Sequence, residues 1–296
     1  MKKFRFKKID AFARGLSAGN PAGCVYLDHA GDITDEEMQG IAAQLKGFVS
    51  EVVYVFPDND GFLLRYFSSE REVDFCGHGT IAAMYDVIKS DGRLLEKSNL
   101  SIRVKGEILD VVNDIGGSDS VFITAPLPLY KDTMIGADNA AAALEIDTST
   151  IDAKQSIAVV NAGLNTLIIP ITTLDACLAI NPTQKDLKEF CRDLGIDIVL
   201  VFSAETSSDE HHYRTRVFAP RYGYLEDPAT GSGNSAFACY LLHRGAWDGR
   251  ELVIEQNNDR CNPNIIRVRT IKKDGTRRVQ FGGGAVVRIE GDYILP

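Results

Sequence analysis

The chain has 296 residues, enough for one large domain or two of ordinary size, and its 45% hydrophobic and 25% charged residues are typical of a folded globular protein. Its 32 basic and 41 acidic residues give a net charge of −9, which argues against nucleic acid or an anionic membrane as the main partner. No apolar run approaches the roughly 20 residues that a membrane-spanning helix needs.

The N-terminal segment and the cysteines predict a protein that stays in the cytoplasm. Residues 1–12, MKKFRFKKIDAF, are basic but lack the apolar core of a signal peptide. The cysteines have no CxxC spacing, so in a chain of this size they indicate reduced thiols that are mostly buried. They are Cys24, Cys76, Cys177, Cys191, Cys239 and Cys261. We therefore expect a cytoplasmic α/β protein.

The first half of the chain predicts strands and helices that lead to a glycine-rich turn. Residues 19–28 (GNPAGCVYLD) predict a strand, and residues 45–56 (LKGFVSEVVYVF) predict a helix end that passes into a β-branched strand. Residues 65–75 (RYFSSEREVDF) lead into the turn CGHG. The apolar spacing of residues 82–88 (AAMYDVI) then predicts a helix.

The second half repeats this order of elements. Residues 163–171 (GLNTLIIPI) and 191–202 (CRDLGIDIVLVF) parallel the first two segments. Residues 216–229 (RVFAPRYGYLEDPA) lead into the turn TGSG, and residues 236–244 (AFACYLLHR) have helical apolar spacing. Four matched elements in the same order indicate an internal duplication.

The two glycine turns are the most closely matched part of the repeat. The segments EVDFCGHGTIA and EDPATGSGNSA both carry a glutamate four residues before the turn: Glu72 precedes Cys76, and Glu226 precedes Thr230. Both then continue with G-x-G. We therefore expect two similar α/β domains that face each other across a cleft, each pointing the N-terminus of a glycine-capped helix toward it.

The domain boundary is predicted after residues 121–130 (VFITAPLPLY), because the passage that follows is less strand-like. The last strand, residues 279–295, contains three successive glycines, and such a break would let it pass from one domain to the other. The expected domains are residues 1–125 plus 285–296 and residues 126–284.

Two converging helix N-termini would bind a small carboxylate. Their unpaired N–H groups and aligned peptide dipoles favour anions, and glycines let a ligand approach the backbone closely. The glycines concerned are Gly77, Gly79, Gly231 and Gly233, and the side-chain donors are Thr80, Ser232, Asn234 and Ser235. One such turn alone is better explained by tight turns and helix packing, whereas the matched pair favours binding.

Three other chemistries have less support. Zinc needs three or four ligands, and Cys76 and His78 supply two, so no metal is expected. Ser232 lacks the glycine two residues earlier that a hydrolase nucleophile elbow requires. A helix N-terminus lowers a thiol pKa, which makes Cys76 an acid/base candidate. However, Thr230 at the matching position excludes a two-cysteine mechanism, so another residue must move the proton.

Segments along the whole chain form a specific set: DAFARGLSAGNPAGCVYLD, SEVVYVF, EVDFCGHGT, RVFAPRYG with EDPATGSGNSA, and FGGGAVV. Together they resemble the phenazine biosynthesis PhzF-like family, which belongs to the diaminopimelate epimerase and proline racemase fold group. The resemblance implies two similar domains, each a mixed sheet rolled around a central helix, with the active site in the cleft between them. It also implies a cofactor-independent isomerase that is usually a homodimer.

The resemblance further implies roles for individual residues. Glu51, in SEVVYVF, matches the family's proton shuttle, and His78 and Asp227 match its neighbours. A single group that gives a proton and takes it back is what a proton shift beside a carboxylate requires. Gly77 and Gly231 match positions whose amides would bind the substrate carboxylate, and Ser232 and Asn20 match further site positions. The remaining substrate-binding candidates lie in the same turns: Cys76, Gly79, Thr80, Thr230 and Gly233.

The chain departs from the family pattern in two places. Residues 255–269 (EQNNDRCNPNIIRVR) stand where a QG-x-EMGRPS-like segment is common, and Asn234 and Ser235 stand where alanine and glycine are frequent. These departures weaken any transfer of the phenazine precursor as the substrate, and fold analogy alone names none.

Three functions stay open. The leading one is an isomerase that moves a proton on a small carboxylate-bearing metabolite with Glu51 as acid/base. The second is an amino-acid racemase or epimerase that uses Cys76 with a non-thiol partner. The third is a protein that binds small carboxylates without turning them over. All three predict a small-molecule ligand and no cofactor.

Overall fold

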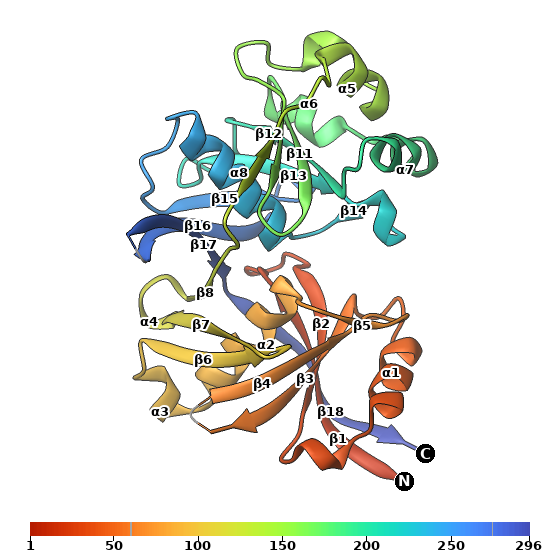
Figure 1. Cartoon of the computed structure of the whole chain (residues 1–296), viewed down its shortest axis with the longest axis vertical. Helices are drawn as coiled ribbons and strands as arrows, with labels where there is room; N and C mark the ends of the chain where they lie inside the picture. The colour runs from red at the N-terminus through yellow and green to blue at the C-terminus, as the bar shows by residue number, and fades with distance from the viewer. Residues whose placement is uncertain (60, 274) are drawn as a thin grey trace. The chain divides into compact units, whose positions relative to one another are not determined.

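The computed structural model describes residues 1–59, 61–273 and 275–296, and the chain divides into two compact units. The first unit comprises Met1–Thr124 with Gly282–Pro296, and the second comprises Ala125–Phe281. Both units combine strands with helices (Figure 1). Among the described residues, none of the helices has the length and apolar character needed to cross a membrane.

The first unit contains a mixed sheet and helices on both of its faces. Its strands are β1 (Lys2–Ala11), β2 (Asn20–Tyr26), β3 (Glu51–Asp58), β4 (Gly61–Phe67), β5 (Glu72–Val73), β6 (Asn99–Val104), β7 (Glu107–Asp114), β8 (Ser120–Thr124) and β18 (Ala285–Leu295). Its helices are η1 (Ala30–Asp32), α1 (Asp35–Gln44), α2 (Gly77–Ser90), α3 (Gly92–Leu95) and α4 (Ile115–Ser118).

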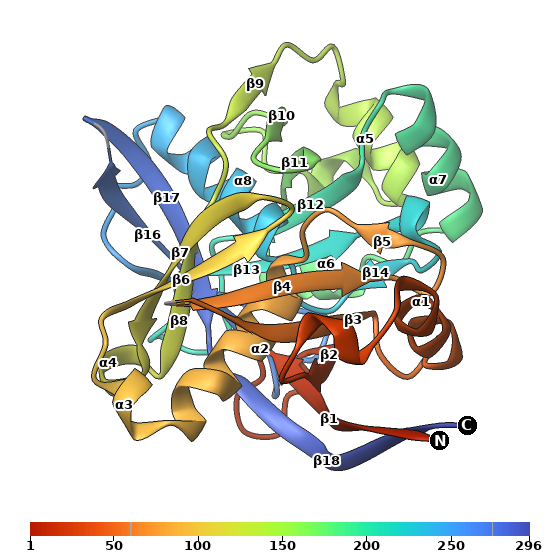
Figure 2. The ribbon, with the colours of Figure 1, turned by 60° about the horizontal axis from the view of Figure 1, so that its bottom comes forward.

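The sheet contains both parallel and antiparallel neighbours. β1 lies between β18 and β2 and is antiparallel to both, whereas β2 and β3 are parallel. β4 is antiparallel to β3 and β5 and parallel to β6, and the sheet continues through antiparallel β7 and β8. Because β1 and β18 pair along their length, with Lys2 opposite Leu295, the two ends of the chain lie side by side (Figure 2).

The central helix of the first unit is α2. Its N-cap is Cys76, whose sulfur accepts a hydrogen bond from the Gly79 amide, and its apolar residues recur at helical spacing. Ile81, Met84 and Ile88 are fully buried, and burial of side chains of this size stabilises a fold by roughly 1.5–3 kcal/mol each. The helix contacts β1, β2, β3, β8 and β18, so the sheet surrounds it on several sides.

The opposite face of this sheet is covered by α1. Thr34 and Glu37 form a capping box at its start, each side chain bonding the other's backbone amide. Met38 and Ile41 from this helix join a cluster of buried side chains on the strands, among them Tyr54. The Tyr54 hydroxyl donates a hydrogen bond to the backbone oxygen of Met38 at 2.7 Å, and this bond joins β3 to α1.

The main strands and the central helix of the first unit recur in the second unit, in the same order along the chain. Its strands are β9 (Leu129–Lys131), β10 (Ala158–Asn161), β11 (Asn165–Pro170), β12 (Ile198–Ser203), β13 (Tyr213–Phe218), β14 (Glu226–Asp227), β15 (Leu252–Gln256), β16 (Asn264–Lys273) and β17 (Thr276–Gly283), the last ending in the first unit. Its helices are α5 (Ala137–Leu144), η2 (Thr148–Thr150), α6 (Leu174–Ala179), α7 (Gln184–Asp193), η3 (Pro220–Tyr222) and α8 (Gly231–His243).

The strands of the second unit pair in the order found in the first. β10 and β11 are antiparallel, as β1 and β2 are, and β11 and β12 are parallel, as β2 and β3 are. β13 is antiparallel to β12 and β14 and parallel to β15, which repeats the pairings of β4. The central helix α8 contacts β10, β11, β12 and β16. The prediction of two similar α/β domains, each a mixed sheet around a central helix, is confirmed.

The glutamate four residues before each turn has the same structural role in both units. In the first unit, Arg65 on β4 donates two hydrogen bonds to the Glu72 carboxylate, at 2.8 and 2.9 Å. In the second, Arg216 on β13 donates two to Glu226, at 2.9 and 2.8 Å. Such bidentate pairs are strong and directional, so each one fixes a short strand, β5 or β14, to the longer strand before the turn.

Candidate active site

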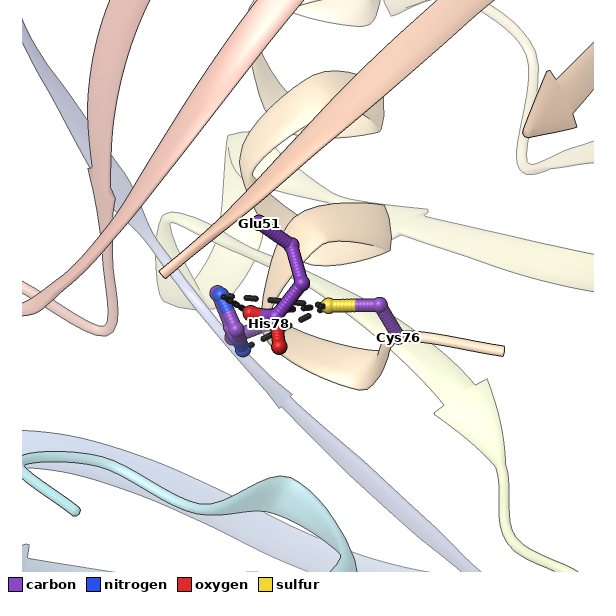
Figure 3. A group of neighbouring side chains, drawn as sticks. All are labelled: Glu51, Cys76 and His78. Atoms are coloured by element: carbon purple, nitrogen blue, oxygen red, sulfur yellow. Dashed lines mark hydrogen bonds and ion pairs between the residues drawn. The ribbon is translucent and has the colours of Figure 1, made fainter. Parts of the chain in front are cut away.

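Three side chains that carry chemistry meet at the start of α2 in the first unit. Glu51 is the first residue of β3, and the pairing of β3 with β2 places it opposite Ala22. Cys76 is the N-cap of α2, and His78 is the second residue of that helix. Figure 3 shows the three side chains converging from the strand and the helix start. We call Glu51, Cys76 and His78 the Glu–Cys–His cluster.

The distances within the cluster are those of direct contact. His78 Nε2 lies 3.2 Å from Glu51 Oε2. Cys76 Sγ lies 3.5 Å from His78 Nδ1, 3.8 Å from His78 Nε2 and 3.9 Å from Glu51 Oε2. The side chains of Glu51 and His78 are 23% and 13% exposed. The cluster is therefore enclosed by protein but still reached by solvent or a small ligand.

The electrostatics of the cluster favour a protonated His78. Burial alone would lower the pKa of this imidazole, but the Cys76 sulfur and the Glu51 carboxylate beside it outweigh burial and raise the pKa well above its ordinary value. His78 can then donate from Nε2 to the Glu51 carboxylate. A charge-assisted hydrogen bond of this kind holds the carboxylate in one orientation.

Cys76 does not behave as a thiol activated by a helix N-terminus. Burial raises the pKa of its thiol and is the largest effect. His78 lowers this pKa, the Glu51 carboxylate raises it, and the hydrogen bond from the Gly79 amide lowers it, but burial prevails. The expectation that the helix N-terminus lowers this pKa is therefore wrong, because burial at this position is the larger effect. A buried thiol whose pKa is raised is a poor general base.

The turn before α2 has amide groups to offer an anion. The Gly79 amide donates to Cys76 Sγ at 3.4 Å, and the Thr80 amide donates to the Cys76 backbone oxygen at 2.9 Å. Within the described part of the chain, the amides of Gly77 and His78 have no hydrogen-bond partner. Gly79 is also required by packing, because a Cβ there would lie 2.7 Å from a methyl group of Val53.

The other candidates of the first unit support the fold around the cluster. The Thr80 side chain is fully buried, and its hydroxyl bonds the Cys76 backbone oxygen at 2.8 Å and the Tyr66 hydroxyl at 2.6 Å. Asn20, at the start of β2, is also buried, and its Oδ1 accepts from the Ser50 hydroxyl at 3.2 Å. Since Ser50 immediately precedes Glu51, Asn20 helps to fix the backbone from which Glu51 projects.

A second polar group lies at the start of α8 in the second unit. Asp227, on β14, is buried and accepts a short hydrogen bond from the Thr230 hydroxyl. Gln256, the last residue of β15, bonds three parts of this turn. Its Nε2 donates to the Asp227 backbone oxygen at 2.8 Å and to the Thr230 hydroxyl at 3.0 Å, and its Oε1 accepts from the Thr230 amide at 2.9 Å. Gln256 therefore holds this turn as Cys76 holds the first.

Two expected donors of this second turn bond the helix instead of facing a ligand. Asn234 is fully buried, and its Nδ2 donates to the Thr230 backbone oxygen at 2.9 Å and to Gln256 Oε1 at 2.7 Å. The Ser235 hydroxyl donates to the Gly231 backbone oxygen at 2.8 Å. Both were expected to offer hydrogen bonds to a carboxylate, and that expectation is wrong because their donors are satisfied inside the fold.

The remaining candidates of this turn are glycines and a serine at the start of α8. Gly231 is needed for packing, because a Cβ there would lie 2.3 Å from the ring of Phe281. Gly233 is buried, and Ser232 is partly exposed. Within the described residues, the amides of Gly231 and Ser232 have no hydrogen-bond partner, as is the case for the first two residues of α2.

Sequence reasoning missed two features of these sites. Glu51 adds a third potential metal ligand to Cys76 and His78, and the three ligand atoms lie within 4.8 Å of one another. The strand order that brings Glu51 to the turn could not be read from the spacing of residues. Gln256 was missed because it lies 26 residues beyond Thr230, in a segment noted only for its departure from a family pattern.

The described fold and site can be compared with known proteins. The sequence profile of the phenazine biosynthesis-like protein family matches residues 9–291. A crystal structure of a PhzF-family phenazine biosynthesis protein from Bacillus anthracis superposes with a TM-score of 0.87 at 27% identity, covering 100% of both chains. A hydroxyproline epimerase from Agrobacterium vitis has the same fold, with a TM-score of 0.61 at 11% identity over 99% of this chain and 91% of its own.

A relative of assigned activity is also similar over nearly its whole length. The trans-2,3-dihydro-3-hydroxyanthranilate isomerase of Pseudomonas chlororaphis is 28% identical over 295 residues, which cover 97% of this chain and 98% of that protein. The family profile and this relative show an isomerase, and the fold has the epimerase-type architecture. The chain belongs to the phenazine biosynthesis-like protein family. The predictions of this family and of an isomerase are confirmed.

Proposed function

We propose that the protein is a cofactor-independent isomerase that moves a proton on a small carboxylate-bearing metabolite, with Glu51 as the acid/base. The observation that carries the proposal is the contact between Glu51 Oε2 and His78 Nε2, at 3.2 Å, beside the unpaired amides that begin α2. It supports the proposal because a carboxylate that would carry the proton lies in contact with an imidazole that would orient it, next to amides that would bind an anion.

Each part of the cluster supports a step of the proposed reaction. The amides of Gly77 and His78, at the positive end of α2, would bind the substrate carboxylate. The Glu51 carboxylate would take a proton from the carbon next to that group and return it to another position of the same molecule. His78 would keep Glu51 oriented throughout. Positioned acid/base catalysis of this kind contributes roughly 100- to 10,000-fold to a rate.

The second turn is also proposed to contact substrate, as the family resemblance implies. Asp227 would orient the substrate or pass a proton, and the amides of Gly231 and Ser232 would bind a charged group. Two buried bonds support this role: the Thr230 hydroxyl donates to the Asp227 carboxylate, and Gln256 donates to the Asp227 backbone oxygen. We also propose a cytoplasmic homodimer, supported by the family resemblance, and sedimentation velocity measures its oligomeric state.

Exchange of substrate hydrogen in heavy water tests the proposal. A panel of small carboxylates, including the compound named for the Pseudomonas chlororaphis relative, is incubated with the protein, and deuterium uptake is followed by mass spectrometry. Glu51→Gln, which keeps the shape of the side chain but cannot carry the proton, is expected to lower the rate of uptake by about 100-fold or more.

The matched control is Glu107→Gln, a change of the same type at an exposed position of the same unit. It is expected to exchange like the parent. Circular dichroism and thermal unfolding establish that both variants are folded. Equal uptake by Glu51→Gln and the parent would remove Glu51 from the mechanism, whereas stabilisation by a ligand without any uptake would favour a binding protein.

A further inference from the structure

The Glu–Cys–His cluster contains one thiol, one imidazole and one carboxylate. These are the three types of side chain that bind Zn²⁺ in proteins, and sites with three protein ligands leave a fourth position for water or an anion. Hard cations such as Mg²⁺ and Ca²⁺ prefer sites built from oxygen ligands. The composition of the cluster therefore selects for a thiophilic divalent cation.

The spacing of the donor atoms also fits zinc. A tetrahedral zinc ion with bonds of about 2.0–2.3 Å holds its ligand atoms about 3.4–3.6 Å apart. In the cluster, Glu51 Oε2 and His78 Nε2 are 3.2 Å apart, and Cys76 Sγ lies 3.8 Å from that nitrogen and 3.9 Å from that oxygen. These three separations are within about 0.3–0.4 Å of a tetrahedral arrangement. Because Cys76 Sγ lies closer to His78 Nδ1, at 3.5 Å, than to Nε2, the imidazole must turn to direct Nε2 at the ion.

The backbone holds these donors close together without an ion. Cys76 and His78 are fixed by the first turn of α2, and Glu51 is fixed by the pairing of β3 with β2. The Gly79 amide donates to Cys76 Sγ at 3.4 Å, a contact that favours the thiolate form of a metal ligand. Exposure of 23% at Glu51 and 13% at His78 leaves a route for an ion from solvent.

We propose that Glu51, Cys76 and His78 bind one Zn²⁺ ion per chain and that this ion blocks the active site. On binding, the Cys76 thiol and the protonated His78 imidazole each release one proton to solvent. The sulfur then bonds the metal, while His78 binds through the freed Nε2 and Glu51 through Oε2. Binding rests on the donor geometry alone. Inhibition rests in addition on the proposed function, because a coordinated Glu51 carboxylate cannot accept a substrate proton.

Titration of the full-length, metal-free protein tests the binding. The probe is Zn²⁺ alone, measured by calorimetry, and Co²⁺ serves as a spectroscopic substitute. All variants carry Cys261→Ser, which removes the exposed thiol. We expect one equivalent of zinc and a thiolate-to-cobalt charge-transfer band. Cys76→Ser should lose that band and bind zinc about 100-fold more weakly or worse, since loss of even a supporting residue costs a metal site 10–100-fold.

A second variant keeps the test decisive if Cys76→Ser is unfolded. Glu51→Gln retains the thiol and should keep the charge-transfer band while binding zinc more weakly. Mg²⁺ and Ca²⁺ should neither compete with zinc nor slow exchange. Unchanged zinc affinity in both variants, or a cobalt complex of the parent without the thiolate band, would overturn the site.

The two proposals fail in distinguishable ways. Zinc that binds as expected in a protein whose Glu51→Gln variant still exchanges deuterium would support the metal site and refute the proposed function. Exchange that depends on Glu51 but continues undiminished with zinc bound would refute the inhibition. Exchange that stops as one equivalent of zinc is added, and returns when a chelator is added, would support both.

Discussion

The proton on His78 is stabilised by two neighbours that the unfolded chain does not keep in place. Because the folded state raises the pKa of this imidazole, its protonation stabilises the fold fully below the unfolded pKa of about 6.5, and this contribution disappears as the pH rises through the folded pKa. The parent is therefore expected to lose stability relative to His78→Gln when the pH is raised from about 6 to about 9.

Urea denaturation of the two proteins across this range measures that difference. Titrating groups that do not contact His78 are common to both proteins and cancel in the comparison. A difference in the free energy of unfolding that stays constant with pH would show that the contacts of His78 do not change its proton affinity.

Cys76 distinguishes the leading function from a cysteine-based racemase. We expect Cys76→Ser to retain most of the deuterium exchange of the parent, because the thiol is buried, its pKa is raised and Glu51 carries the proton. Serine can still accept a hydrogen bond at the helix N-cap. The exchange assay measures this directly. A loss of about 100-fold or more in a folded Cys76→Ser protein would instead assign the proton to the thiol.

How much of the cluster could be predicted differs from residue to residue. Cys76 and His78 stand in one short motif, so their proximity follows from the sequence. Glu51 lies 25 residues before Cys76, and only the resemblance to a family linked the two. The structural reason is that β3 lies parallel to β2 and begins beside the first turn of α2, an arrangement set by sheet topology, which local patterns do not reveal.

At the scale of elements, the duplicated Arg–Glu pair provides an internal comparison. The Arg216 side chain is 2% exposed and Glu226 is 19% exposed, whereas Arg65 and Glu72 are 24% and 32% exposed. Removal of one partner from a buried pair leaves an uncompensated charge, which costs about 3–5 kcal/mol, while an exposed pair is worth up to about 1 kcal/mol. Arg65 also keeps a second carboxylate partner, Asp35, at 2.6 Å, whereas Arg216 donates otherwise to neutral backbone oxygens, those of Cys177, Leu178 and Ile180.

Glu226→Gln is therefore expected to destabilise the protein by several kcal/mol, and Glu72→Gln by about 1 kcal/mol or less. Guanidinium unfolding of both variants beside the parent measures the two changes. Each variant serves as the matched control of the other, since the substitution and the strand pairing are the same. Equal losses would mean that burial does not set the strength of these pairs.

The order of elements was the most predictable part of the fold. The matched segments of the two halves correctly indicated strand, helix, strand, strand and glycine turn, because hydrophobic periodicity and turn residues are local signals. The way each turn is held was not predictable. Cys76 caps α2 from within its own motif, but Thr230 depends on Gln256 from a later strand. A polar side chain satisfied by a distant strand leaves no local pattern.

At the scale of the whole molecule, the two units differ in how the chain builds them. The second unit is one continuous segment, Ala125–Phe281, whereas the first needs Gly282–Pro296 to complete it. Residues 1–124 alone would lack β18, which pairs with β1 along its length and contacts α2. The first unit can therefore be completed only after the second has been synthesised.

The neighbouring ends of β1 and β18 make the chain suitable for circular permutation. A short Gly/Ser linker from Pro296 to Met1, with new ends opened between Pro126 and Leu127 outside the strands, would make each unit continuous. This permutant is expected to give the circular dichroism spectrum of the parent. One opened between Val53 and Tyr54, in the buried middle of β3, should fail to fold. Folding would then require the register of β1 with β18, whichever of the two strands is translated first.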